Sequence, residues 1–147
     1  MTALTGFYTL TSIQSGKVLD VAGASTADGG NVYQWDANGT DAQAWEVRAT
    51  GEENVYLLVA RCSGKALDVQ DSSKADGANV IQWTIDPARD SQKWRLAPLG
   101  NDSYTLTNVH SGKLLDVYNN GLEAGANVIQ WFANNGDNQK WQLTAIK

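Results

Sequence analysis

The chain repeats one sequence unit three times, and this repetition restricts its possible folds more than any other feature. Three similar segments follow one another with a step of 48 residues, as SGKVLDV at 15–21, SGKALDV at 63–69 and SGKLLDV at 111–117. All six tryptophans fall in two registers of the repeat. They are Trp35, Trp83 and Trp131 in the first register and Trp45, Trp94 and Trp141 in the second. We therefore expect one domain of 147 residues built from units of approximately 1–49, 50–98 and 99–147.

Each unit contains four short runs that favour β-strands, at 7–11, 18–21, 31–35 and 44–47 in the first unit. The runs are rich in Val, Thr, Tyr and Trp and are separated by clusters of Gly, Asn and Asp. No window of about ten residues shows apolar side chains at helical spacing. The sequence predicts an all-β protein of about twelve strands. Three equal units favour a β-trefoil, in which each unit supplies two barrel strands and one capping hairpin.

Composition excludes several classes of function. The net charge of −5 argues against a phosphate backbone or an anionic membrane surface as partner. No apolar stretch approaches the roughly 20 residues that span a bilayer, and the first residues, MTALTGFYTLTS, lack the pattern of a signal peptide. The single cysteine excludes an internal disulfide and leaves the cellular compartment undetermined.

Alternation within two of the runs predicts that one aspartate and one tryptophan lie at the surface of each unit. In the first unit, Leu19 and Val21 share one face, so we expect Asp20 to point outward; the same rule places Trp35 on an outer face. A carboxylate accepts strong hydrogen bonds from hydroxyl groups. An indole offers a flat apolar surface to the C–H groups of a pyranose. The pattern predicts up to three saccharide sites, each with one Asp and one Trp.

Repetition alone does not separate binding from packing, because a buried anchor repeats as faithfully as a ligand contact. The aspartates are alternatively turn caps, and the first-register tryptophans alternatively pack beneath a hairpin. The remaining repeated aromatic residues are predicted to be core anchors. These are Trp45, Trp94 and Trp141, together with Tyr8, Tyr56 and Tyr104.

Each unit ends in Gln-x-Trp, at 43–45, 92–94 and 139–141, and carries Asn-Val-x-Gln-Trp upstream. Together with the LDV segments, these motifs resemble the ricin-B-type lectin family, the QxW β-trefoils also classified as carbohydrate-binding module family 13. The resemblance covers the whole chain. It implies binding of galactose- or N-acetylgalactosamine-type glycans, without catalysis, metal or cofactor, by a monomer or a homodimer.

The resemblance also implies ligand-binding residues at matching positions. They are Asp20, Gly23 (through its amide), Trp35 and Gln43 in the first unit; Asp68, Trp83 and Gln92 in the second; and Asp116, Asn119 (through its amide), Trp131, Asn138 and Gln139 in the third. The glutamines are expected to have a more structural role. The third unit is the most complete, because Asn138 is replaced by Ala42 in the first unit and by Ser91 in the second. The extra residue in the segment 84–90 of the second unit is expected to reshape the rim of that site.

Residues for catalysis are scarce. The only histidine, His110, and the only cysteine, Cys62, occupy the same register in different units, which disfavours a dyad. The sequence also supplies too few His and Cys residues for a zinc site.

Two other interpretations of the function remain open: a binding module that holds a larger glycoside hydrolase on polysaccharide, and a scaffold that binds protein, such as a protease inhibitor or an engineered symmetric protein.

Overall fold

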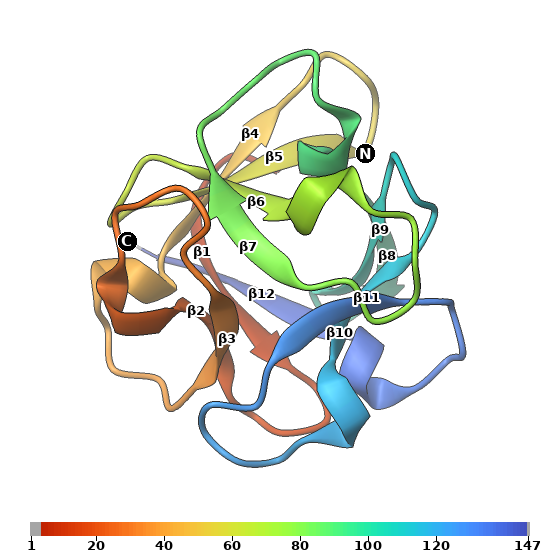
Figure 1. Cartoon of the computed structure of the whole chain (residues 1–147). Helices are drawn as coiled ribbons and strands as arrows, with labels where there is room; N and C mark the ends of the chain where they lie inside the picture. The colour runs from red at the N-terminus through yellow and green to blue at the C-terminus, as the bar shows by residue number, and fades with distance from the viewer. Residues whose placement is uncertain (1–3, 147) are drawn as a thin grey trace.

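The computed structural model describes residues 4–146, which form twelve strands and six 3-10 helices (Figure 1). The first repeat contains β1 (Gly6–Ser12), β2 (Val18–Val21), η1 (Ala22–Ala24), β3 (Val32–Trp35), η2 (Asp41–Gln43) and β4 (Trp45–Ala49). The second contains β5 (Val55–Ala60), β6 (Ala66–Val69), η3 (Gln70–Ser72), β7 (Val80–Trp83), η4 (Asp90–Gln92) and β8 (Trp94–Gly100). The third contains β9 (Ser103–Asn108), β10 (Leu114–Val117), η5 (Tyr118–Asn120), β11 (Val128–Trp131), η6 (Asp137–Gln139) and β12 (Trp141–Ala145). Within residues 4–146, no helix has the length and hydropathy needed to cross a bilayer.

Six strands, two from each repeat, form a closed antiparallel barrel. β1 pairs with β12 and β4, β5 pairs with β4 and β8, and β9 pairs with β8 and β12. The circuit returns to its start, so these strands leave no unpaired sheet edge. The remaining strands form the hairpins β2–β3, β6–β7 and β10–β11, which surround the centre of the view in Figure 1. The predicted β-trefoil is confirmed.

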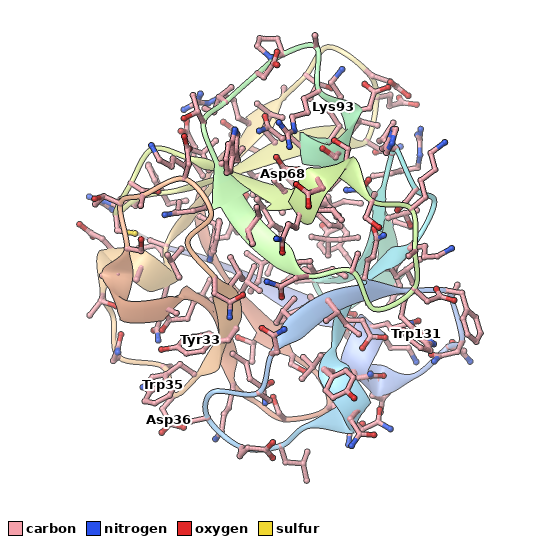
Figure 2. All side chains as sticks on the ribbon, viewed as in Figure 1. Tyr33, Trp35, Asp36, Asp68, Lys93 and Trp131 are labelled. Atoms are coloured by element: carbon pink, nitrogen blue, oxygen red, sulfur yellow. The ribbon has the colours of Figure 1, made fainter. Side chains whose placement is uncertain are left out.

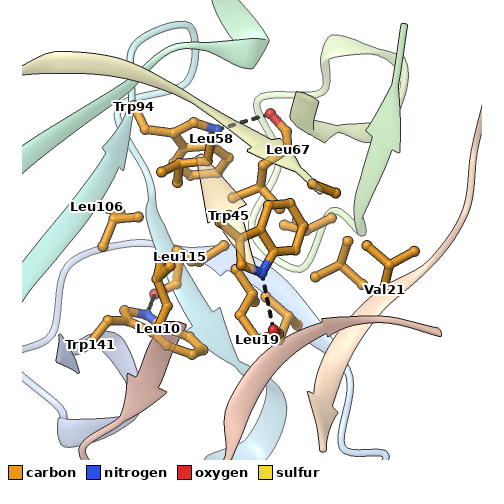
Figure 3. Packing of buried hydrophobic residues seen from close by; sticks show 14 of the residues in the cluster. Leu10, Leu19, Val21, Trp45, Leu58, Leu67, Trp94, Leu106, Leu115 and Trp141 are labelled. Carbon is orange, nitrogen blue, oxygen red and sulfur yellow. Dashed lines mark hydrogen bonds between the residues drawn. The ribbon is translucent and has the colours of Figure 1, made fainter. Parts of the chain in front are cut away.

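The core is anchored by the tryptophans that close each repeat. Trp45, Trp94 and Trp141 are fully buried. Each indole Nε1 donates a hydrogen bond to a backbone carbonyl of its own repeat: Leu19, Leu67 and Leu115, at 3.0–3.1 Å (Figure 3). A buried indole therefore keeps its one donor satisfied. The prediction that these tryptophans are core anchors is confirmed, and Tyr8, Tyr56 and Tyr104 also pack in or against the core.

A buried glutamine in each hairpin joins its repeat to the neighbouring one. In β11, Gln130 Nε2 donates to the carbonyls of Ser73 (3.0 Å) and Ala75 (2.9 Å), both in the second repeat. Its Oε1 accepts from Ser111 Oγ at 2.7 Å. The same bonds join Gln82 to the first repeat and Gln34 to the third. The three repeats are thus linked in a ring: the third binds a loop of the second, the second a loop of the first, and the first a loop of the third.

A second ring of polar side chains lies where the hairpins meet. Asn31 donates to Asn127, Asn127 to Asn79 and Asn79 to Asn31, at 2.8–3.0 Å. Each of these asparagines also forms a backbone bridge to the neighbouring hairpin. Each amide is donor to one neighbour and acceptor from the other, so the cycle closes only when all three repeats are present.

We expect Gln130→Leu to lower the free energy of unfolding by about 3 kcal/mol, because two buried carbonyls and one hydroxyl lose their partner. Urea denaturation measures the loss. The matched control is Gln142→Leu, at an exposed position of β12, which should change stability by less than about 0.5 kcal/mol. Equal effects of the two substitutions would show that the cross-repeat bonds do not stabilise the fold.

Candidate functional site

The three site aspartates are buried, which makes the prediction of exposed carboxylates wrong. Their exposed fractions are 5% for Asp20, 0% for Asp68 and 3% for Asp116. The outer face of each hairpin, which alternation assigns to the aspartate, is covered by the 3-10 helix of the same repeat: η2 lies on β2, η4 on β6 and η6 on β10. Strand periodicity identifies the face correctly and carries no information about what covers it.

The QxW glutamines fix this cover. In the third repeat, Gln139 Nε2 donates to Asp116 Oδ2 and to the carbonyl of Phe132, both at 2.9 Å, while its Oε1 accepts from the amide of Asn134. Gln43 and Gln92 make the same bonds in their repeats. The amide therefore ties the loop after the site tryptophan to the aspartate. This is the structural role expected for these glutamines.

Burial raises the pKa of Asp20 and of Asp116. It raises the pKa of Asp116 to about 6, against the opposing effect of hydrogen bonds from Gln139 and Asn138. Burial also raises the pKa of Asp20, which Gln43 opposes. Desolvation disfavours a carboxylate, and the amide donors compensate only in part. Asp116 is thus an acid that titrates near neutral pH.

The third repeat contains a pocket of about 330 Å³ over its aspartate. The lining residues are Asp116, Tyr118, Asn119, Asn120, Ile129, Trp131, Asn134 and Asn138. Asn138 Nδ2 donates to Asp116 Oδ1 and to the carbonyl of Val117, both at 2.9 Å, so the amide is fixed beside the carboxylate. The pocket brings together four residues named from the sequence: Asp116, Asn119, Trp131 and Asn138. Gln139 lies behind them as their support.

Each site tryptophan packs against a loop of a neighbouring repeat. A Cβ atom at Gly77 would lie 3.5 Å from Cζ3 of Trp131, and Gly77 has φ +85°, which L side chains rarely adopt. Trp35 and Trp83 meet Gly125 and Gly29 in the same way. Trp35 is 38% exposed, whereas Trp83 and Trp131 are half-buried. The aromatic wall of each site therefore depends on the closed assembly of repeats.

Two exposed aromatic rings at the pocket of the third repeat were not identified in the sequence analysis. Tyr118 is 57% exposed and Phe132 is 51% exposed. The Phe132 centroid lies 5.8 Å from that of Trp131. A second hollow of about 430 Å³ continues past Tyr118 toward Leu122 and Glu123. The signal was available as a difference between repeats, because Tyr118 corresponds to Ala22 and Gln70 in the other units.

The first repeat fills its own site in part. The rings of Tyr33 and Trp35 stack with centroids 5.3 Å apart and an angle of 18° between their planes (Figure 2). Burial raises the pKa of the Tyr33 hydroxyl, and the charge of Asp20 adds to the effect while the amide of Gly23 opposes it. The phenol thus lies beside two groups that were expected to contact ligand. The corresponding residue in the third repeat, Ile129, leaves the pocket open.

The site of the second repeat differs most from those of the other two repeats. Arg89 Nε lies 3.1 Å from Asp68 Oδ2, and the Arg89 guanidinium carbon lies 5.7 Å from the centre of the Trp83 ring. The hollow in this repeat, about 600 Å³, is lined by Asp71, Ser72, Asp86, Ala88, Arg89, Asp90, Ser91 and His110. Four residues of the segment 84–90 belong to this lining, whereas Asp68 and Trp83 lie outside it.

Other reactive groups do not assemble into a site. Burial raises the pKa of the Cys62 thiol, which packs against the core. Among residues 4–146, no three His, Cys, Asp or Glu side chains are grouped so as to hold a metal ion.

Comparisons with known proteins identify the family. A search of curated proteins found no match. The designed three-fold symmetric protein ThreeFoil is 50% identical with a TM-score of 0.92, over 96% of this chain and 99% of ThreeFoil. An exo-beta-1,3-galactanase from Clostridium thermocellum is 36% identical with a TM-score of 0.92, over 99% of this chain and 31% of the galactanase.

The agglutinin of Rhizoctonia solani shares the fold at 22% identity, with a TM-score of 0.88 over 99% of both chains. The sequence profile of the ricin-type beta-trefoil lectin domain-like family matches residues 2–83 and 90–147. The match covers nearly the whole chain, and the chain belongs to the ricin-type beta-trefoil lectin domain-like family.

Proposed function

We propose that the chain is a carbohydrate-binding domain whose principal site is the pocket of the third repeat. The observation that carries the proposal is the convergence of Asp116, Asn138 and Trp131 on one pocket. Asp116 receives one amide hydrogen bond on each oxygen. A carboxylate has about four acceptor positions, so two remain for neighbouring sugar hydroxyls. The Trp131 ring, supported from behind, offers an apolar face to a pyranose.

Galactose-type sugars are the proposed ligand class. The resemblance to ricin-B-type lectins implies this class, and the 36% identical relative is an exo-beta-1,3-galactanase. Tyr118 and Phe132 add exposed aromatic surface beside the pocket, and the second hollow extends the surface beyond one ring. These features support an oligosaccharide with a terminal galactose rather than a free monosaccharide.

Affinity at the site is expected to be weak, with a Kd of roughly 0.1–1 mM. Sugar hydroxyls exchange hydrogen bonds to water for hydrogen bonds to protein, so each contributes little net free energy. The three repeats are unequal, because Tyr33 narrows the first site and Arg89 lies on the aspartate of the second. We therefore assign most of the binding to the third repeat and treat the first as a narrower, secondary site.

A non-enzymatic role fits the pocket better than glycoside hydrolysis. A raised pKa is typical of a general acid, and Asp116 has one. Hydrolysis, however, needs a second carboxylate within about 5–10 Å, and Asp116 is the one acid among the eight residues that line this pocket. The partly buried thiol of Cys62, with its raised pKa, is poorly suited to act as a nucleophile.

Tryptophan fluorescence during a lactose titration separates this proposal from the protein-binding scaffold. A site indole that meets a sugar ring should change its emission, whereas a scaffold without a sugar site should not respond. Binding to an insoluble galactan distinguishes a polysaccharide-anchoring module from a domain that binds only short glycans.

We expect Asp116→Ala and Trp131→Ala each to weaken lactose binding by about 10–100-fold, because one removes two charge-assisted acceptors and the other removes the apolar wall. Calorimetry measures the affinity, and circular dichroism checks the fold. The control Glu52→Ala removes an exposed acid that pairs with Arg95 and should bind as wild type does. Wild-type affinity in both pocket variants would reject the site.

Lactose binding should weaken about tenfold between pH 7 and pH 5. Burial raises the pKa of Asp116 to about 6, so its carboxylate is mostly ionised at pH 7 and mostly protonated at pH 5, where acceptor capacity is lost. The indole N–H signal of Trp131 in NMR titrations reports on this site alone. Residual binding by Asp116→Asn should lack this pH dependence. Unchanged wild-type affinity at pH 5, with the fold intact, would contradict the role of the ionised carboxylate.

A further inference from the structure

We propose that Arg89 closes the sugar site of the second repeat, so that Asp68 and Trp83 are kept from ligand by a side chain of the same repeat. The proposal rests on the proposed function and names the residue that determines how many sites are open. Arg89 contacts the two side chains that a sugar would need, through an ion pair with Asp68 and a cation–π contact with Trp83.

The contacts of Asp116 and Asp68 show which part of the second site Arg89 occupies. Asp116 accepts one bond on each oxygen. Asp68 accepts from Ser91 Oγ at 2.7 Å on Oδ1, and from Gln92 Nε2 on Oδ2. Arg89 Nε donates a hydrogen bond to Ser91 Oγ at 3.3 Å and forms an ion pair with Asp68 Oδ2 at 3.1 Å. The arginine thus places a positive charge against a carboxylate oxygen that has no cation beside it in the third repeat, and a neutral hydroxyl does not match this charge–charge attraction.

The loop that carries Arg89 departs from the other two repeats at one place. The QxW glutamine binds the amide of Asn38, Asp86 and Asn134 in the three repeats, which fixes their alignment. Two residues follow this point before the 3-10 helix in the first and third repeats, and three follow it in the second, ending at Arg89. The position of Arg89 is held by Thr40 and Gly136 in the other repeats, and neither side chain has the reach or the charge of an arginine.

The family profile breaks at the same segment. Its match ends at residue 83 and resumes at residue 90, so residues 84–89 lie outside the match. The hollow of the second repeat is consistent with closure, because Arg89 belongs to its lining whereas Asp68 and Trp83 do not. Asp68 is fully buried. The inserted residue therefore extends the rim and places a cation over the binding groups.

The test follows the indole N–H signals of Trp83 and Trp131 by NMR during a lactose titration. In the wild-type protein, Trp131 should shift with lactose concentration and Trp83 should not. In Arg89→Ala, Trp83 should also shift, with a Kd within about tenfold of that at Trp131. The control Arg95→Ala removes an exposed arginine paired with Glu52 and should leave Trp83 silent.

A second variant guards against a defect caused by truncating Arg89 within the longer loop. It replaces residues 84–89 with the five residues 132–136 of the third repeat, so that the loop regains the shorter length. Trp83 should respond to lactose in this variant as well. A Trp83 response in the wild-type protein, or silence at Trp83 in both variants while Trp131 responds, would overturn the proposal. Silence at both indoles in every protein would reject the proposed function, and this inference with it.

Discussion

The structure depends on polar bonds that pass from each repeat to the next. Gln34, Gln82 and Gln130 are fully buried, and each donates two hydrogen bonds to backbone carbonyls of a neighbouring repeat. A single repeat has two barrel strands and one hairpin, which leave unpaired edges and an uncovered glutamine. Buried amides without partners are costly, so the chain is stable only when the third repeat closes on the first.

The same contacts between repeats form the proposed pocket of the third repeat. Trp131 lies on the hairpin of the third repeat, but the loop against which it packs, at Gly77, belongs to the second. Gln130, one residue before Trp131, holds that loop in place. A binding wall that rests on a neighbour is fixed before ligand arrives, and preorganisation reduces the loss of side-chain freedom on binding. The fold and the proposed site therefore depend on the same contacts.

The sequence contained most of the fold and only part of the site. A period of 48 residues and alternating runs sufficed for the trefoil, because barrel closure leaves few arrangements for three equal units. Exposure of Asp116 was predicted wrongly, because periodicity assigns a residue to a face and does not show that η6 covers it. Tyr118, which lines the pocket, and Arg89, which contacts Asp68, were missed, since neither repeats, and analysis of a repeat favours what its units share.

These differences between repeats have a physical basis. Positions that carry the ring of buried bonds are the same in all three repeats, because a change in one breaks a contact in another. The loop between the site tryptophan and the 3-10 helix is tied to the fold mainly through one glutamine, so its other residues are free to vary. Variation there placed an arginine on Asp68, while variation in β3 placed Tyr33 against Trp35, and neither disturbs the barrel. A symmetric fold can thus carry unequal sites, since the residues that close the trefoil are not those that open or cover its pockets.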